Sequence, residues 1–408
     1  MKCRHCSAEL ELTLIDLGNA PPSNAYLTES TPRVPEKWFP LRVLVCTECW
    51  LVQTEDYAGI KELFDAEYAY FSSFSITWLR HAEAYVAEMI ERFELNTSSN
   101  VIEVAANDGY LLQYVKAKGI PCLGIEPTAS TAAAACKKGI AIIGEFFGPQ
   151  LARKLVTQGK QADLMVANNV LAHVPDINSF VQGFTQLLKP QGVVTFEFPH
   201  LMRLVGQTQF DTIYHEHFSY LSLTAVKRIF DFNGLQIFDV QEIPTHGGSL
   251  RVFAQRKDEG KHNTTAKVEI LITREVAVGM RTEQYYTDFQ KRANDIKHEL
   301  IKFLMESKRQ GKNVVAYGAA AKGNTLLNYA GVRSDLLSFV VDRNPAKQGK
   351  FLPGTRIPIV DEARLHKEHP DYVVILPWNL KAEITEQLAY IRKWDGKFVT
   401  FVPILSVD

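Results

Sequence analysis

The chain has 408 residues, which at ~100–200 residues per domain is enough for two to four domains, each with a buried core. Hydrophobic residues make up 46% of the chain and charged residues 22%, the balance of an ordinary globular protein. The 45 basic and 46 acidic residues give a formal net charge of -1, which argues against a protein that binds nucleic acid or an anionic membrane through bulk positive charge.

The sequence contains no apolar run that approaches the ~18–20 residues of a membrane span. Its first residues, Met1 to Cys6, lack the apolar core of a signal peptide, so we expect a cytoplasmic protein. Six cysteines are too few for a disulfide scaffold in a chain of this length, and a reducing compartment would keep them as thiols.

Four of the six cysteines form two Cys-x-x-Cys pairs, Cys3 with Cys6 and Cys46 with Cys49. The 39 residues between the pairs exceed the ~15–20 of a compact zinc ribbon, but four thiolates can still bind one Zn²⁺ tetrahedrally. Because no coordination position would remain for water, we expect the zinc to be structural. The proline-rich, polar segment between the pairs could then fold around the metal. The alternative is four unrelated buried cysteines.

From residue 100 onward, segments typical of strands and helices alternate. The expected strands are 101–104, 121–125, 141–143, 163–167 and 192–197, and the expected helices are 110–117, 128–138 and 177–188. This alternation predicts an α/β domain with a parallel sheet, helices on both faces, and ligands at the carboxyl ends of the strands.

The first turn of this domain favours S-adenosylmethionine (SAM) over a dinucleotide. Ala105 and Ala106 stand where a Gly-x-Gly-x-x-Gly motif would bring backbone close to a pyrophosphate, and SAM has no phosphate. Glu126, at the end of the second strand, can accept hydrogen bonds from both ribose hydroxyls; the alternative is a surface cap on a loop. The candidate cofactor-binding residues are Glu103, Asn107, Gly109, Glu126, Glu145 and Asn168.

The C-terminal third predicts a long amphipathic helix over 268–309 and then a second small doubly wound unit. Its expected strands are 313–318, 336–341, 372–376 and 397–402. Residues 318–325 open a helix whose N–H groups could hold a phosphate, with Lys322 adding charge. A second nucleotide site beside SAM would mean that the substrate carries the nucleotide; the alternative is a duplicated fold without a ligand. The candidate substrate-binding residues are Lys322, Asn324, Asp342 and Trp378.

Several strings along nearly the whole chain resemble one known family. They are the opening Cys-x-x-Cys, 16–18, 21–27, 46–53, 68–73, 107–112, 214–220 and 246–251. Together they resemble the SAM-dependent nucleotide-sugar C-methyltransferases, of the type that adds the 3-C-methyl group to a dTDP-4-keto-deoxysugar. The resemblance implies a zinc-binding lobe (1–65), a Rossmann-like class I SAM methyltransferase domain (66–260) and a second Rossmann-like α/β lobe (261–408) that binds the nucleotide sugar.

C-methylation next to a ketone requires a base for the α-proton and a donor for the enolate oxygen. Tyr214, His215, Glu216 and His217 concentrate such groups. In an extended segment the two histidines would share one face, whereas a turn could bring all four together. We choose His217 as the base, because an ordinary histidine pKa of ~6.5 suits proton transfer near neutrality. The resemblance points to the same histidine, with Tyr214 as its partner.

Three further residues complete the candidate catalytic set. Tyr68 would be a second phenol near the ketone, Glu216 would orient a histidine or bind a sugar substituent, and His173 lies on the cofactor rim. The alternatives are structural packing, a metal site for the Tyr-His-Glu-His string, and a capping role for His173.

The sequence thus predicts C-methylation, at C3, of a nucleotide-linked 4-keto-deoxysugar in branched deoxysugar biosynthesis. We expect dTDP or GDP as the nucleotide, no nucleic-acid or membrane partner, and a monomer. The alternatives are an O-methyltransferase of a sugar or other small molecule and a non-catalytic, zinc-dependent binding protein. A NAD-dependent oxidoreductase is disfavoured by the missing glycines.

Overall fold

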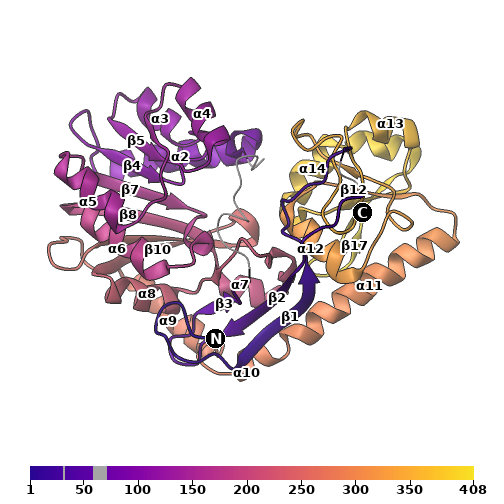
Figure 1. Cartoon of the computed structure of the whole chain (residues 1–408), viewed down its shortest axis with the longest axis horizontal. Helices are drawn as coiled ribbons and strands as arrows, with labels where there is room; N and C mark the ends of the chain where they lie inside the picture. Colours follow the sequence, from indigo (N-terminus) through magenta and orange to yellow (C-terminus); the bar gives the residue numbers. More distant parts are fainter. Residues whose placement is uncertain (31–32, 58–70) are drawn as a thin grey trace.

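The computed structural model describes residues 1–30, 33–57 and 71–408, which form three sheets (Figure 1). The first sheet is antiparallel, in the order β1-β2-β3-β9. Its strands are β1 (Leu12–Ala20), β2 (Phe39–Val45), β3 (Val52–Thr54) and β9 (Ser219–Tyr220). Three strands therefore come from the N-terminal lobe, and a segment from the middle of the chain supplies the fourth.

The second sheet has seven strands in the order β10-β11-β8-β7-β4-β5-β6. They are β4 (Val101–Val104), β5 (Cys122–Ile125), β6 (Ile142–Ile143), β7 (Ala162–Asn168), β8 (Leu188–Pro199), β10 (Leu235–Ile243) and β11 (Ser249–Arg256). Strands β4 to β8 are parallel, whereas β11 is antiparallel to both β8 and β10. The parallel direction predicted for the strands between residues 101 and 197 is confirmed. β10 runs in the same direction as β8, and β11 is reversed between them, because residues 244–248 are too short a connection for a parallel crossover from β10 to β11.

Helices cover both faces of the second sheet. They are α2 (Ile76–Arg92), α3 (Leu112–Ala117), α4 (Ala129–Lys137), α5 (Pro149–Thr157), α6 (Ile177–Leu187) and α8 (Leu223–Phe232). The next helix along the chain from α6, α7 (Leu201–Gly206), packs instead with the first and third sheets. Successive side chains of a strand point to opposite faces. Val101 accordingly packs in one core with α2 and α3, whereas Ile102 and Val104 pack in another core with α5, α6 and α8.

The third sheet has the order β14-β13-β12-β15-β16-β17 and is parallel except for β17. Its strands are β12 (Val314–Tyr317), β13 (Val340–Val341), β14 (Ile359–Val360), β15 (Tyr372–Ile375), β16 (Lys397–Thr400) and β17 (Ser406–Val407). Its helices are α12 (Ala321–Ala330), α13 (Ala363–Glu368) and α14 (Lys381–Gln387). The prediction of a second, smaller doubly wound unit is therefore confirmed.

One long helix over 268–309 does not form. The segment contains α9 (Ala266–Ala277), α10 (Gln284–Thr287) and α11 (Phe289–Arg309). The chain leaves the first helix at Gly279, whose φ of +93 lies in the left-handed region that glycine adopts without a Cβ clash. In Figure 1, α11 extends from below the first sheet to the third sheet.

A single hydrophobic core joins the first and third sheets. It contains Leu14 and Val43 of the first sheet, Leu300 of α11, Leu326 of α12 and Val374 of the third sheet. The N-terminal and C-terminal lobes thus pack on each other as well as on the middle of the chain. Within the described residues, none of the helices combines the length and the apolar character that crossing a bilayer requires.

Candidate active site

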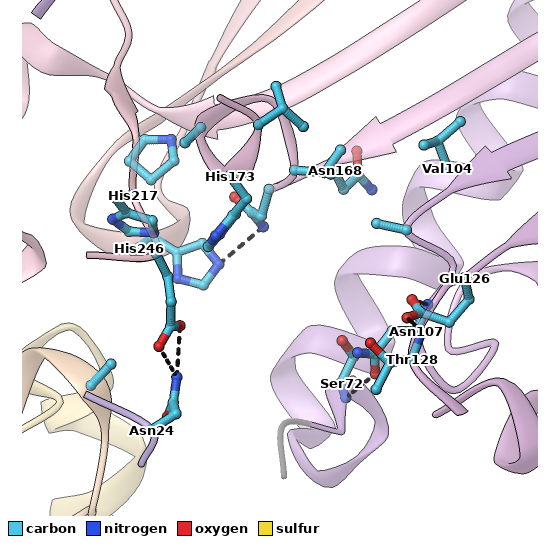
Figure 2. A pocket seen from close by; sticks show the side chains of 18 of the residues that line it. Asn24, Ser72, Val104, Asn107, Glu126, Thr128, Asn168, His173, His217 and His246 are labelled. Atoms are coloured by element: carbon cyan, nitrogen blue, oxygen red, sulfur yellow. Dashed lines mark hydrogen bonds between the residues drawn. The ribbon is translucent and has the colours of Figure 1, made fainter. Parts of the chain in front are cut away.

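A cavity of about 360 Å³ lies at the carboxyl ends of β4, β5 and β7 and reaches the start of α12. All three lobes contribute to its wall, through Asn24 of the N-terminal lobe, the middle domain, and Lys322 and Lys347 of the C-terminal lobe. In Figure 2, Asn107, Glu126 and Thr128 lie at one end, which we call the cofactor end. The opposite end, with His173, His217 and His246, is the catalytic end.

Glu126 is the central polar residue of the cofactor end. It follows β5, and its two carboxylate oxygens accept hydrogen bonds from the backbone N–H of Asn107 (2.9 Å) and of Thr128 (2.9 Å). These bonds hold the carboxylate at the cavity wall and leave each oxygen a further lone pair for a ligand. Ala105 and Asn107 have φ of +59 and +48, so a tight left-handed turn brings the loop after β4 to this carboxylate.

The residues present at the cofactor end fit SAM. The Glu126 carboxylate can accept a pair of ribose hydroxyls, and Phe146 and Phe147 give the wall aromatic surface. The side-chain oxygens of Asn168 and Asn169 are buried and have no hydrogen-bond partner among the described residues, and both asparagines line the cavity. Such oxygens would be satisfied by donors of a bound molecule.

Three predicted cofactor residues lie outside this wall. Glu103 is buried within β4, and burial raises its pKa well above the ordinary value. Gly109 (φ +74) closes the turn, where a Cβ would lie 2.3 Å from a methyl carbon of Ile140. Glu145 is exposed and forms an ion pair with Lys154 at 2.8 Å. Contacts of these three residues with the cofactor stay predictions.

The Tyr-His-Glu-His segment is a turn, not a strand. The N–H of His217 donates to the carbonyl of Tyr214 (2.9 Å). Tyr214, Glu216 and His217 all line the cavity, whereas His215 faces away, with Nε2 3.2 Å from the carbonyl oxygen of Pro40. Of the two arrangements that the sequence left open, the turn is the one that forms, and it brings three of the four residues to the cavity.

The hydrogen bonds of His217 define its protonation. Its Nδ1 lies 2.8 Å from the carbonyl oxygen of Thr212, which can only accept, so Nδ1 carries the proton. Nε2 then accepts from the Tyr214 hydroxyl at 2.8 Å. Burial, with contributions from His173, Lys322 and other charges, lowers the pKa of His217 well below 6.5. The expectation of an ordinary histidine pKa is wrong, and the imidazole is neutral throughout the physiological range.

Two more groups flank this pair. The His173 ring is 4.7 Å from the His217 ring, and burial lowers the pKa of His173 to about 4. The Asn24 amide donates to both carboxylate oxygens of Glu216, at 2.9 and 2.7 Å, and burial raises the pKa of Glu216 to about 8. Tyr68, the remaining predicted catalytic residue, lies outside the described residues.

Lys322 is the predicted substrate-binding residue that reaches the cavity. Its Nζ donates to the Asn379 side chain (2.6 Å) and lies 4.9 Å from the ring centre of Trp378. Burial lowers the pKa of Lys322 from its ordinary value. Trp378 lies behind it and donates from Nε1 to Asp211 (2.7 Å).

The other two predicted substrate residues are also outside the cavity wall. Asn324 is buried within α12. The Asp342 carboxylate accepts from the backbone N–H of Ala319 (2.8 Å) and of Asn344 (2.8 Å). It therefore shapes the loop before α12, and direct contact of either residue with a substrate stays a prediction.

Sequence reasoning missed His246 and Asn169. Both line the cavity in left-handed backbone conformations (φ +53 and +52), and His246 Nε2 lies 3.3 Å from the Asn169 amide nitrogen. Burial lowers the pKa of His246 to about 4. The sequence did offer one signal for His246, because it directly precedes Gly247 and Gly248. Paired glycines mark a segment of unusual backbone conformation, and non-glycine residues in such conformations cluster at functional sites. Asn24 was also missed as a site residue, because it stood out only as a member of the family-like string 21–27.

The four paired cysteines come together at the edge of the first sheet. The sulfur atoms of Cys3 and Cys49 are 3.5 Å apart, those of Cys6 and Cys46 are 3.5 Å apart, and all four lie within 4.8 Å of one another. A tetrahedron with Zn–S bonds of ~2.3 Å has sulfur atoms ~3.8 Å apart, so the cluster fits one Zn²⁺.

Known proteins match the whole length of the chain. The family model described as "Putative zinc binding domain" matches residues 3–64, "Methyltransferase domain" matches 78–240, and "C-methyltransferase C-terminal domain" matches 244–403. C-methyltransferase NovU of Streptomyces niveus is 31% identical over 402 residues, which cover 98% of this chain and 95% of NovU.

Two similar solved structures align with half of the chain or less. Magnesium protoporphyrin IX methyltransferase (ChlM) from Synechocystis PCC 6803, with bound SAM, is 15% identical with a TM-score of 0.34, covering 44% of this chain and 79% of ChlM. The PH0226 protein from Pyrococcus horikoshii is 14% identical with a TM-score of 0.38, covering 50% of this chain and 100% of PH0226. The full-length match to NovU and the three family matches identify this chain as a member of the C-methyltransferase family, a SAM-dependent C-methyltransferase with a structural zinc site.

Proposed function

We propose that the enzyme methylates C3, one of the two ring carbons next to the ketone, of a nucleotide-linked 4-keto-deoxysugar in branched deoxysugar biosynthesis. The observation that carries the proposal is the neutral His217–Tyr214 pair in the same cavity as the cofactor end. An O-methyltransferase would need no base for a C–H bond. The similarity to C-methyltransferase NovU supports transfer to carbon.

His217 is the proposed base. SAM, when bound, supplies the electrophilic methyl group. The α-proton of the sugar ends on Nε2 of His217, while the electron pair of the C–H bond passes into the enolate. Because the Tyr214 hydroxyl occupies the Nε2 lone pair, the proton arrives either directly, after the phenol turns toward the ketone, or through the phenol oxygen.

A histidine of lowered pKa is a weak base, so the ketone must be polarised. His246 and Tyr214 both line the cavity and are the proposed hydrogen-bond donors to the ketone. A neutral imidazole N–H or a phenol O–H can stabilise an enolate oxygen. Glu216 would bind a hydroxyl or amino substituent of the sugar. His173 remains a proposed second-rank contributor at the same end, and Tyr68 stays a proposed second phenol near the ketone.

The C-terminal lobe is the proposed site of the nucleotide diphosphate, dTDP or GDP. Lys322, Lys347 and residues 320 and 321 at the start of α12 line one side of the cavity. Lysine charge and helix N–H groups together suit phosphate oxygens. We accordingly propose a zinc-binding domain at 1–65, a methyltransferase domain at 66–260 and a nucleotide-sugar domain at 261–408.

The deciding experiment is turnover of a panel of dTDP- and GDP-linked 4-keto-deoxysugars with SAM, followed by mass spectrometry and by NMR to locate the methyl group. We expect a product with one added methyl group on C3. A second arm replaces SAM by S-adenosylhomocysteine in deuterium oxide and follows exchange of the substrate's α-proton. A methylated oxygen together with no exchange would overturn the proposal in favour of O-methylation.

A further inference from the structure

The segment that carries His217 is part of the sheet of the zinc lobe. β9 begins two residues after His217 and pairs with β3, where Gln53 lies opposite Ser219 and Val52 opposite Tyr220. β3 in turn follows Cys46 and Cys49 directly along the chain. The base of the middle domain therefore lies directly before a strand that pairs with the N-terminal lobe.

Gln53 connects this strand pair to the cysteine cluster. Its side chain is fully buried, its Nε2 donates to the sulfur of Cys3 (3.3 Å), and its Oε1 accepts from the backbone N–H of Arg4 (2.9 Å). A zinc-bound thiolate is a better acceptor for such a bond than a thiol, because it carries more negative charge. One buried amide thus spans the cysteine loop and the strand that faces β9.

Thr54, next to Gln53 in β3, and Arg4, which is hydrogen-bonded to Gln53, hold the backbone of His217 and of the following residue, Phe218. The Thr54 hydroxyl donates to the carbonyl of His217, and the Thr54 N–H donates to the carbonyl of Phe218 (3.2 Å). The Arg4 Nε donates to the same Phe218 carbonyl (3.2 Å), and its guanidinium lies 5.1 Å from the centre of the Phe218 ring. The cysteine loop and β3 therefore contact both residues at the end of the Tyr-His-Glu-His turn.

We propose that Gln53 and Thr54 are positioning residues for His217, through which the metal-loaded cysteine cluster fixes the base of the reaction. The proposal rests on the proposed role of His217. The imidazole is held by Thr212, just before the turn, and by Tyr214 within it. Asn24 and Pro40 anchor the turn from outside at Glu216 and His215, and the bonds from Thr54 and Arg4 anchor it at His217 and Phe218, the end that carries the base. A displacement of ~1 Å at a reacting group can cost on the order of 10²-fold in rate.

The first test compares Gln53→Ala with Gln255→Ala. Gln255 is an equally buried amide at the end of β11 remote from the cavity; it forms two hydrogen bonds with the backbone of His262 and donates a third to the Gln236 side chain (3.4 Å). Each variant is measured for zinc per chain, thermal midpoint, SAM affinity by calorimetry, and α-proton exchange over a range of pH. We expect Gln53→Ala to keep SAM affinity within about twofold and to lower the exchange rate at saturating substrate at least tenfold.

The pH profile distinguishes positioning from general destabilisation. Burial holds the pKa of His217 well below 6.5, and a base that leaves this place titrates closer to 6.5. In Gln53→Ala the acid limb of the exchange profile should therefore move to higher pH, while in Gln255→Ala it should stay in place. An unchanged limb and an unchanged maximal rate in Gln53→Ala would overturn the inference.

Thr54 provides the second variant if Gln53→Ala fails to fold or loses its zinc. Thr54→Val removes the hydrogen bond from the Thr54 hydroxyl to the carbonyl of His217 and changes no contact with a cysteine. One zinc per chain should therefore remain while the rate of α-proton exchange falls. Thr54→Ser keeps a hydroxyl and should restore the exchange rate. Wild-type exchange in Thr54→Val with zinc retained refutes the positioning role. Absence of exchange in the unaltered enzyme would instead refute the proposed function.

Discussion

The two ends of the cavity are built in different ways. The cofactor end comes largely from one stretch, the loop after β4 and the end of β5, which are joined by the hydrogen bond from the Asn107 N–H to the Glu126 carboxylate. The catalytic end combines Asn24, the turn at 214–217, His246 and Lys322, which are far apart along the chain. A cofactor site of local origin can be read from spacing, whereas a catalytic site assembled from three lobes depends on how those lobes pack.

The largest expected effect is at the catalytic end. His217→Asn should keep SAM affinity and lower turnover by roughly 10²–10⁴-fold, the usual contribution of a positioned general base. The same variant should lose α-proton exchange with S-adenosylhomocysteine bound. Exchange at the native rate would transfer the role of base to His173 or Tyr68.

The pH dependence of exchange sharpens the same assignment. The base must be neutral, and burial places the pKa of His217 well below 6.5. Exchange in the unaltered enzyme should therefore stay level as the pH falls from 8 through 6.5 and decline only below that range. A decline centred near ~6.5 would mean that the base is an exposed, ordinary histidine.

At the cofactor end, Glu126→Ala should weaken SAM binding by roughly 10- to 150-fold, which corresponds to charge-assisted hydrogen bonds worth on the order of 1.5–3 kcal/mol. Calorimetric titration with SAM measures the change. Glu145→Ala makes the same truncation at an exposed carboxylate that is paired with Lys154. We expect a much smaller loss of SAM affinity in Glu145→Ala than in Glu126→Ala. Equal losses in the two variants would support the prediction from the sequence that Glu145 binds the cofactor.

The fold was predictable where the pattern is local. Apolar runs located the strands around Val101–Val104 and Ala162–Asn168 to within a residue or two, and paired cysteines indicated the metal site. The break at Gly279 was missed because one glycine, without proline, does not by itself end an amphipathic pattern. The antiparallel β11 was missed because strand direction depends on the connection and not on the apolar pattern.

The candidate site was predictable by residue type and less so by geometry. Glu126, His217, Tyr214 and Lys322 all reach the cavity. The direction of His215 was not predictable, because a turn and a strand place alternate side chains differently. The bond from Asn24 to Glu216 joins residues 192 positions apart, and no local spacing encodes such a contact. The lowered pKa of His217 follows from burial by all three lobes and is equally invisible in sequence.

Tyr214→Phe should have a smaller effect than His217→Asn if the proton reaches Nε2 directly. The phenol then contributes only one donor to the enolate oxygen, and His246 can compensate. We expect a loss on the order of tenfold or less in turnover. A loss as large as that of His217→Asn would show instead that the proton passes through the phenol oxygen. Measuring exchange and methylation separately tells which step has slowed.

The last prediction concerns Glu216, and its effect appears in stability rather than in turnover. Burial raises the pKa of Glu216 to about 8 from an ordinary 4.5, so the folded protein keeps a proton that the unfolded chain loses. The contribution of Glu216 to the unfolding free energy is therefore highest below pH 4.5 and declines as the pH rises through that window toward 8. Glutamine cannot titrate, so the thermal midpoint of Glu216→Gln should rise relative to the unaltered protein between pH 5 and pH 8.

Glu55→Gln is the matched control, because the Arg42 side chain lowers the pKa of Glu55 below 4.5. The stabilising effect of that ionised carboxylate is fully present above pH 4.5 and is lost only as the pH falls through its folded pKa. The difference between Glu55→Gln and the unaltered protein should then be constant from pH 5 to pH 8. An equally flat difference for Glu216→Gln would mean that Glu216 ionises normally beside Asn24. The catalytic end would in that case be wetter than its three-lobe enclosure implies.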